Sequence, residues 1–281
     1  MGDMMRLKSR QKSLIMLLGA GSVFLLAFFL LPLLFVLSES FVGDDGIVTA
    51  ARYIAVLVDE QFQNVYVRTL KMALVVTVIA VFAGYPTAYL MMKLRPSRKA
   101  MLMSLVILPL MTSPVARTYA WIVILGRYGI VNQTLSLLGM TREPIRMLYT
   151  EGAIIIGLLQ LFLPIMVLNL VSALENVPNE VEEAALSLGS NKVGTFFRVI
   201  VPLSFDGLIM GVTLVFTGCI TAYVTPAILG GAKVLTLATL MRQQALVLMN
   251  WEAATVIAVV MILTTLVLHT VMRRFRPRNQ T

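Results

Sequence analysis

Charged residues are scarce in this sequence: Asp, Glu, Lys and Arg make up 13% of its 281 residues, whereas 58% are hydrophobic. Soluble domains carry about 25% charged residues. This deficit excludes an ordinary soluble domain and indicates an integral membrane protein. The net charge of +9 does not indicate a nucleic-acid partner. Lys and Arg lie in short clusters beside apolar runs, a pattern typical of membrane orientation.

Residues with catalytic or metal-binding chemistry are also scarce. The single cysteine, Cys219, excludes a disulfide within the chain. The single histidine, His269, belongs to no cluster with metal-ligand spacing. The sequence also lacks a G-x-x-x-x-G-K-[ST] phosphate loop, so the chain itself should not bind ATP. We therefore predict a protein without catalytic residues, metal or bound cofactor, which is not an enzyme.

Long apolar runs, by contrast, are abundant. A membrane-spanning helix needs about 20 mostly apolar residues, and six runs meet this length: residues 14–37, 69–91, 101–125, 153–174, 203–229 and 253–271. Several contain proline, which membrane helices tolerate when neighbouring helices satisfy the freed backbone groups. The first run is too long for the apolar region of a signal peptide, so we predict that it is retained. The sequence thus predicts an all-α integral membrane protein with six transmembrane helices.

Basic clusters predict the orientation of these helices. Lys and Arg gather at residues 6–12, 93–99 and 273–278, and cytoplasmic segments carry an excess of both. Both termini are therefore expected in the cytoplasm, as residues 1–13 and a basic tail of residues 272–281, with the transmembrane domain at 14–271. The loop at 175–202, between the fourth and fifth helices, falls on the same side although it is net acidic. Outside, residues 131–138 are predicted to form a short amphipathic helix ending at Gly139, which would either cover an opening or simply connect two spans.

The acidic loop carries the signals of a short, capped helix. Asn179 can cap it, and Glu182 stands three residues later, as in a capping box. The acids of the first turn favour the positive end of the helix dipole, and Gly189 suits the position just after the helix. We predict a helix over about residues 180–188, a second helix capped by Ser190 or Asn191, and a constraint from Pro202 before the fifth span.

One face of this first helix is shallow. Val181, Ala184, Ala185 and Leu188 share it by their spacing, so another surface could approach its backbone. In the second helix, Phe196 and Phe197 are bulky apolar side chains of the kind that anchor interfaces. Two interpretations fit these residues: a helix that docks into a groove of another protein, and an ordinary amphipathic connector.

The stretch EAALSLGSNKVGTFFRVIVP resembles the EAA loop of ABC-transporter permease subunits, whose pattern is E-A-A, three residues, Gly, nine residues and I-x-L-P. The matching positions are Glu183, Ala184, Ala185, Gly189 and Pro202. Val199 and Val201 replace the Ile and Leu of the pattern. The stretches NVYVRTLKMALVVTVIAVFAGYPTAYLM, ILPLMTSPVARTYAWIVIL and AYVTPAILGGAKVLTLATLM are similar to permease subunits of spermidine/putrescine-type importers, a resemblance that covers nearly the whole chain.

The resemblance implies a type I ABC importer in a bacterial inner membrane. Its partners would be a second permease, two cytoplasmic ATPase subunits that bind ATP and Mg, and a periplasmic or extracellular substrate-binding protein. The loop at 175–202 would couple the permease to the ATPase through Glu182, Glu183, Ala184, Ala185, Gly189 and Pro202. The alternative is a stand-alone secondary transporter or channel that needs no ATPase.

Polar residues inside the spans are candidates for the substrate pathway. Arg117, in MTSPVARTYAWI, is a charge deep in an apolar run, with Ser113 and Tyr119 nearby. The fifth span adds Thr217, Thr221 and Tyr223. Structural explanations compete, because an arginine can extend to the membrane surface and threonines can pack helices. The spans contain almost no carboxylates, which a polyamine would be expected to require. A neutral or anionic substrate therefore remains an alternative.

Overall fold

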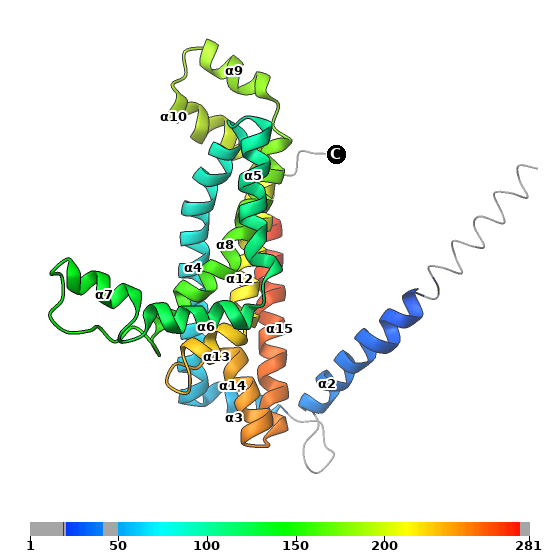
Figure 1. Cartoon of the computed structure of the whole chain (residues 1–281). Coiled ribbons are helices and arrows are strands. Elements are labelled where there is room, and N and C mark those ends of the chain that lie inside the picture. The colour runs from blue at the N-terminus through cyan, green and yellow to red at the C-terminus, as the bar shows by residue number, and fades with distance from the viewer. Residues whose placement is uncertain (1–18, 20, 42–49, 276–281) are drawn as a thin grey trace, which may run out of the picture.

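The computed structural model describes residues 19, 21–41 and 50–275, and every regular element within them is a helix (Figure 1). The all-α fold class is therefore confirmed. Residues 1–13, together with 14–18, 20, 42–49 and 276–281, lie outside the described residues. In the described part, four helices are long and apolar enough to cross a membrane, or up to six if each of two bent helix pairs counts as one span.

Three long helices form the centre of the protein: α4 (Glu60–Met92), α8 (Glu151–Glu175) and α12 (Phe205–Thr221). Small residues let them approach closely, as is common in membrane bundles. A Cβ atom placed on Gly84 would lie 2.9 Å from Cγ of Met166, and one on Gly207 would lie 2.1 Å from Cβ of Ala173. The core is thus set by contact between α8 and its two neighbours, with α15 (Trp251–Arg274) packed beside α12.

We expect Gly207→Val to destabilise this core. The new side chain would overlap Ala173 on α8, and overpacking of this kind costs about 1–3 kcal/mol. The thermal unfolding midpoint of the purified protein in detergent should fall. Gly152→Ala is the matched control, because the nearest atom to its new Cβ is Oγ1 of Thr150 at 3.7 Å. Equal midpoints for the two variants would contradict the prediction.

The predicted third span is not one helix. It divides into α5 (Pro96–Ile107), a 3-10 turn η2 (Leu108–Met111) and α6 (Pro114–Leu125). The segments on either side of residues 112–113 are bent by 95°. Thr112 and Ser113 have ψ angles of 151° and 128°. The ring of Pro114 disfavours helical backbone at Ser113, the residue before it. The prediction of a continuous helix over 101–125 was wrong for this reason.

The predicted fifth span is broken as well. α12 ends at Thr221, Ala222 is extended, and a separate short helix α13 (Val224–Leu229) follows. At its other end, α12 meets the segment of α10 (Lys192–Thr195), η3 (Phe196–Ile200) and α11 (Val201–Leu203) at 70°. The single helix predicted for 203–229 was wrong. Pro202 does lie just before the bend between α11 and α12, as expected.

The other boundaries are closer to prediction. α8 and α15 extend the predicted spans by a few residues. α7 (Ile130–Leu137), with Gly139 at φ 69° after it, confirms the short helix predicted over residues 131–138. α4 begins well before the predicted residue 69, because Asp59 caps it by accepting a hydrogen bond from N of Phe62 at 2.9 Å. Hydropathy alone does not detect this polar first turn.

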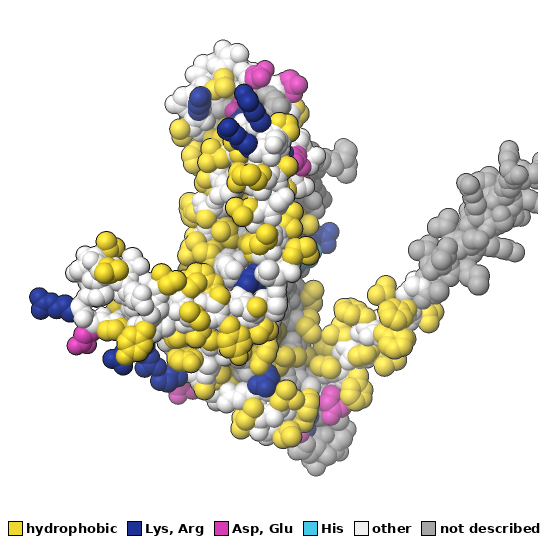
Figure 2. All heavy atoms as spheres, in the orientation of Figure 1, with side chains coloured by type: hydrophobic (Ala, Val, Ile, Leu, Met, Phe, Trp, Pro, Cys, Tyr) yellow, Lys and Arg dark blue, Asp and Glu magenta, His cyan; other side chains and the backbone are white. Residues whose placement is uncertain are grey.

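The first helix, with η1 (Leu26–Leu30) and α2 (Leu31–Phe41), diverges from the bundle (Figure 1). It contacts the remainder near its end, where Oγ of Ser40 lies 2.7 Å from the hydroxyl of Tyr53 on α3 (Ala51–Val58). Figure 2 shows hydrophobic side chains over the middle of the visible bundle face, with most charged ones nearer its two ends. This distribution is the one expected of a protein surrounded by lipid.

The two ends of the bundle carry different elements. α9 (Asn179–Ser187) and α10 lie at one end, and α3, α13 and α14 (Leu237–Arg242) lie toward the other (Figure 1). α15 runs between them and finishes on the α9 side. The acidic loop and residue 274 therefore share one side of the bundle. That this side is the cytoplasm remains a prediction from the basic clusters.

Candidate functional site

The acidic loop forms the predicted helix with a different N-terminal cap. α9 begins at Asn179, and Pro178, with extended backbone at ψ 137°, is the N-cap residue. The predicted capping box of Asn179 and Glu182 was therefore wrong. Instead, the Glu182 carboxylate accepts a hydrogen bond from the Tyr89 hydroxyl at 3.0 Å and pairs with Nζ of Lys93 at 2.5 Å. Glu182 therefore bonds to Tyr89 and Lys93, which are distant in sequence, and not to the backbone at the start of its own helix.

The C-terminal end of α9 follows the prediction. Gly189 has φ 89°, N of Gly189 donates to O of Leu186, and N of Ser190 donates to O of Ala185. This pair of hydrogen bonds is the Schellman arrangement, which requires a left-handed residue and favours glycine there. Asn191 then caps α10, because its Oδ1 accepts a hydrogen bond from N of Gly194 at 2.6 Å. Both turns are fixed by residues adjacent in sequence.

The two acids at the centre of the loop have different surroundings. The Glu182 side chain is 17% exposed, whereas Glu183 is exposed to solvent. A second ion pair, between Nζ of Lys99 and Glu175 at 2.7 Å, joins α5 to the end of α8. Glu182 therefore ties α9 to the end of α4, and any force applied to α9 has a direct route into the central bundle.

The two phenylalanines also separate. Phe196 packs edge-on against Tyr85 and Tyr89, with ring centroids 5.3 and 5.0 Å apart, and Tyr85 bonds in turn to the Ser204 hydroxyl. The prediction that Phe196 anchors an interface was wrong, because it joins the loop to α4 instead. Phe197 is 65% exposed.

Exposed apolar side chains gather on the loop. We call Leu188, Val193 and Phe197, together with Glu183, the loop surface. Leu188 is 90% exposed and Val193 66% exposed. Ala184 is exposed beside them, whereas Val181 and Ala185 are half-buried. Exposed apolar side chains close together in a loop are typical of protein-binding surfaces.

The pathway candidates lie on the two bent segments. Arg117, on α6, is half-buried, and its Nε and Nη1 atoms have no hydrogen-bond partner among the described residues. Its neighbour Thr118 is buried, and its hydroxyl lies 3.3 Å from that of Thr225 on α13. Ser113 and Tyr119 are exposed. α6 thus contacts α13 through Thr118, and Arg117 stays a predicted pathway residue.

The threonines of the fifth span bond to their own helix. The Thr221 hydroxyl donates to O of Thr217 at 3.0 Å, and Thr213 does the same toward Ile209. These bonds satisfy both hydroxyls within α12, and Thr217 and Thr221 stay predicted pathway residues. Tyr223 lies in the break after α12, with the Arg242 guanidinium carbon 5.5 Å from its ring centroid. Sequence reasoning missed Gln160, an amide in the apolar fourth span that accepts a hydrogen bond from Trp121 at 3.0 Å.

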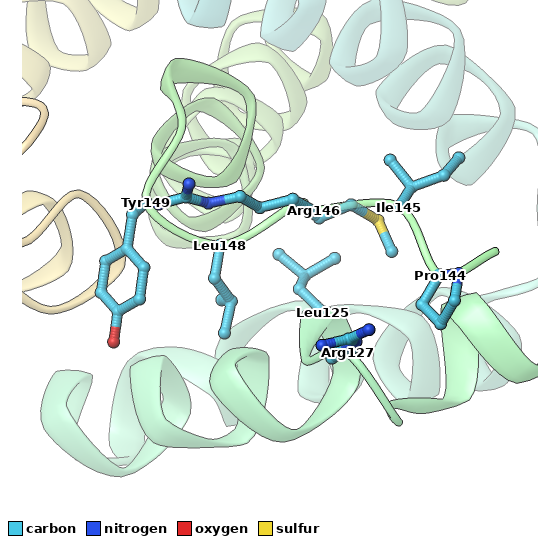
Figure 3. Close-up of a pocket in the computed structure, with 8 residues that line it drawn as sticks. Leu125, Arg127, Pro144, Ile145, Arg146, Leu148 and Tyr149 are labelled. Carbon is cyan, nitrogen blue, oxygen red and sulfur yellow. The ribbon is translucent and has the colours of Figure 1, made fainter.

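Cavities lie beside the α7 arm, which projects sideways from the bundle (Figure 1). One of about 370 Å³ lies between the end of α6 and residues 144–149, where Figure 3 shows Leu125, Leu148 and Tyr149 facing the space. Another of about 370 Å³ shares Arg127 and Pro144 with it. Buried Asn132 holds the arm together by bonding to Gly126 and Ile145. No residue pattern in the sequence predicts these cavities.

The bundle and its capped loop define a multi-pass membrane permease. Residues 77–281 match the family described as binding-protein-dependent transport system inner membrane component, and the chain belongs to this family. It is a permease component of an ABC importer and a multi-pass protein of the inner membrane.

Named relatives cover most of the chain. It is 38% identical over 241 residues to the spermidine/putrescine transport system permease protein PotB of Haemophilus influenzae, covering 84% of each chain. It is 33% identical over 252 residues to PotB of Escherichia coli K12, covering 87% of this chain and 91% of that one. Among solved structures, it is similar to a bacterial alginate ABC transporter in complex with alginate pentasaccharide-bound periplasmic protein. There the TM-score is 0.77 over 96% of both chains, and the 16% identity supports the fold alone.

Proposed function

We propose that this chain, with a second permease, forms the translocation pathway of an ATP-driven polyamine importer. Two ATPase subunits and a periplasmic substrate-binding protein complete the assembly. The relatives named as spermidine/putrescine permeases, at 38% and 33% identity, support the substrate class. The complex of the alginate transporter with a periplasmic protein supports a binding-protein partner.

Two observations together support an ATPase partner: the loop surface is exposed, and Glu182 connects α9 to the end of α4. Leu188 is 90% exposed, whereas Glu182 of the same helix bonds to Tyr89 and Lys93 on α4. A protein that binds the loop surface would therefore move α4 as well. Closure of the ATPase subunits on ATP would pull α9 and reorient the bundle by rigid-body motion.

Two carboxylates at the starts of α8 and α15 are already paired with cations of the chain itself. Glu151 pairs with Arg68 at 3.2 Å and lies 3.5 Å from Lys71, and Glu252 pairs with Arg52 at 2.6 Å. Acidic residues for a polyamine would therefore come from the second permease or from the binding protein. Aromatic rings and carbonyl oxygens of this chain would supply the remaining contacts, since both interact with ammonium groups.

Uptake by the complete importer tests the function. We expect proteoliposomes holding the importer to accumulate labelled putrescine only when ATP is inside and binding protein outside. Excess spermidine should compete, whereas a neutral diol and a dicarboxylate of equal length should not. Competition by the dicarboxylate would instead indicate an anionic substrate.

A second measurement distinguishes the ATP-driven importer from a stand-alone secondary transporter. The chain reconstituted alone, with an ion gradient and without ATP, should not transport putrescine. Gradient-driven uptake by the chain alone would overturn the ATPase-coupled function and establish a secondary transporter.

A further inference from the structure

The α7 arm carries positive charge without matching negative charge. Arg127, Arg142 and Arg146 are all exposed, and no ion pair or side-chain hydrogen bond joins any of them to another described residue. Glu143 is the one acid between residues 126 and 150, and it lines neither of the two cavities beside the arm. Figure 2 shows Lys and Arg side chains at the tip of the arm and along its lower edge. This surface therefore favours an anionic ligand.

The three arginines line adjoining cavities. Each cavity has a volume of about 370 Å³, and Arg127 lines both, whereas Arg146 lines the first and Arg142 the second. Figure 3 shows Arg127 and Arg146 at the first cavity together with the apolar side chains of Leu125 and Leu148. Guanidinium groups gathered in this way repel one another. An anion bound between them would offset this repulsion.

A buried asparagine holds the backbone of two of these arginines in place. Nδ2 of Asn132 donates to O of Gly126 and to O of Ile145, both at 3.0 Å, and its Oδ1 accepts from N of Ile145 at 2.9 Å. Gly126 and Ile145 directly precede Arg127 and Arg146 in the sequence. The two arginines are thus positioned before a ligand binds, which lowers the entropy cost of binding.

The arm runs at the level of a membrane surface. α5 starts at the α9 end of the bundle (Figure 1), and with η2 it rises through 12 and 4 residues, or about 26 Å. The hydrocarbon core of a membrane is about 30 Å thick. After the bend, the segment Pro114–Leu137 runs at 95° to α5. When α5 crosses the membrane, α6 and α7 therefore lie along its opposite surface.

The arm also exposes apolar side chains. Ile130, Leu137 and Leu138 lie on α7 or directly after it, and all three are more than 60% exposed. Basic segments with exposed apolar residues are typical of helices that lie between the headgroups and the acyl chains of a membrane. A phospholipid offers a phosphate, which arginine binds by charge-assisted hydrogen bonds, and acyl chains for the apolar side chains.

We propose that the two cavities bind the phosphate headgroup of an anionic phospholipid, with Arg127 as the shared contact and Arg142 and Arg146 on either side of it. The proposal does not depend on the substrate that the importer carries. Phosphatidylglycerol has a net negative charge, whereas phosphatidylcholine adds a quaternary ammonium group that the arginines repel. The site therefore prefers phosphatidylglycerol. A bound lipid would hold the α7 arm along the membrane surface.

Native mass spectrometry of the purified protein, with its co-purifying subunits, tests the proposal. Phosphatidylglycerol should bind more tightly than phosphatidylcholine. One arginine near an anionic headgroup contributes about fivefold in affinity, so Arg127→Gln should weaken phosphatidylglycerol binding by about fivefold. Combined with Arg142→Gln and Arg146→Gln, the loss should reach about a hundredfold. Lys233→Gln is the matched control, since it removes one positive charge from the turn after α13 but lines neither cavity.

Lysine at the same three positions keeps the charge and should retain most of the preference for phosphatidylglycerol. This variant shows that a loss in the glutamine variant does not come from misfolding. Soluble glycerol 3-phosphate should bind far more weakly than the lipid, because it has no acyl chains to contact the apolar side chains. Equally tight binding of glycerol 3-phosphate would identify a soluble phosphate as the ligand and overturn the lipid site.

Three other results would also overturn the proposal. The first is equal binding of phosphatidylglycerol and phosphatidylcholine by the unaltered protein. The second is unchanged phosphatidylglycerol binding in the triple glutamine variant. The third is a triple glutamine variant that keeps its lipid but loses the substrate-binding protein, which would make the arm a docking surface for that protein.

Discussion

Glu182→Lys should abolish most ATP-driven uptake while leaving membrane insertion intact. The substitution places a cation against Lys93, whose Nζ now lies 2.5 Å from the Glu182 carboxylate, and it removes the acceptor of the Tyr89 hydroxyl. Hydrogen bonds to charged groups contribute about 1.5–3 kcal/mol, so we expect uptake to fall by about tenfold or more. ATPase activity should continue without transport, because α9 would move without α4.

A charge exchange makes this prediction specific. Glu182→Lys combined with Lys93→Glu restores opposite charges at the same two positions, and it should recover part of the lost uptake. Glu180→Lys is the matched control, since it makes the same change of charge on an exposed residue in the first turn of α9. If Glu180→Lys reduces uptake as strongly as Glu182→Lys, the loss comes from the change in loop charge. The contacts of Glu182 with Tyr89 and Lys93 would then have no part in coupling ATP hydrolysis to transport.

Leu188→Asp should separate the permease from its ATPase subunits. Leu188 is 90% exposed, so the aspartate costs little in the folded chain. A central apolar contact in a protein interface contributes about 2 kcal/mol or more, and a buried, unpaired carboxylate would add to the loss. We therefore expect the amount of ATPase that co-purifies with the permease to fall sharply.

Leu137→Asp provides the comparison. Leu137 is 87% exposed and lies on α7, away from the loop surface. The Leu137→Asp variant should co-purify with as much ATPase as the unaltered protein does. Equal ATPase binding by both variants would show that the loop surface does not dock the ATPase.

Local chemistry explains why the loop was largely predictable. The helix over residues 179–187, the left-handed Gly189 and the cap by Asn191 each depend on residues a few positions apart. The start of α9 is the exception. Glu182 was available both to a local cap and to Lys93, and the ion pair with a residue on another helix prevailed.

The pathway was less predictable because polar residues in apolar spans have several possible partners. Thr221 bonds to its own helix, whereas Thr118 reaches Thr225 on a helix that follows a break in the chain. Gln160 could not be singled out from the sequence, since a single amide side chain forms no periodic or spaced motif. Its contact with Trp121 depends on how segments far apart in the chain are folded against each other.

The sequence by itself determined the class of protein, the positions of most spans and the capped loop. These properties follow from apolar run length and from hydrogen bonds between near neighbours. Only the tertiary structure decided that Glu182 is tied to α4 and that Arg242 faces Tyr223. Each of these depends on residues brought together from separate helices. Such contacts arise from packing and charge in three dimensions, which no local pattern of residues encodes.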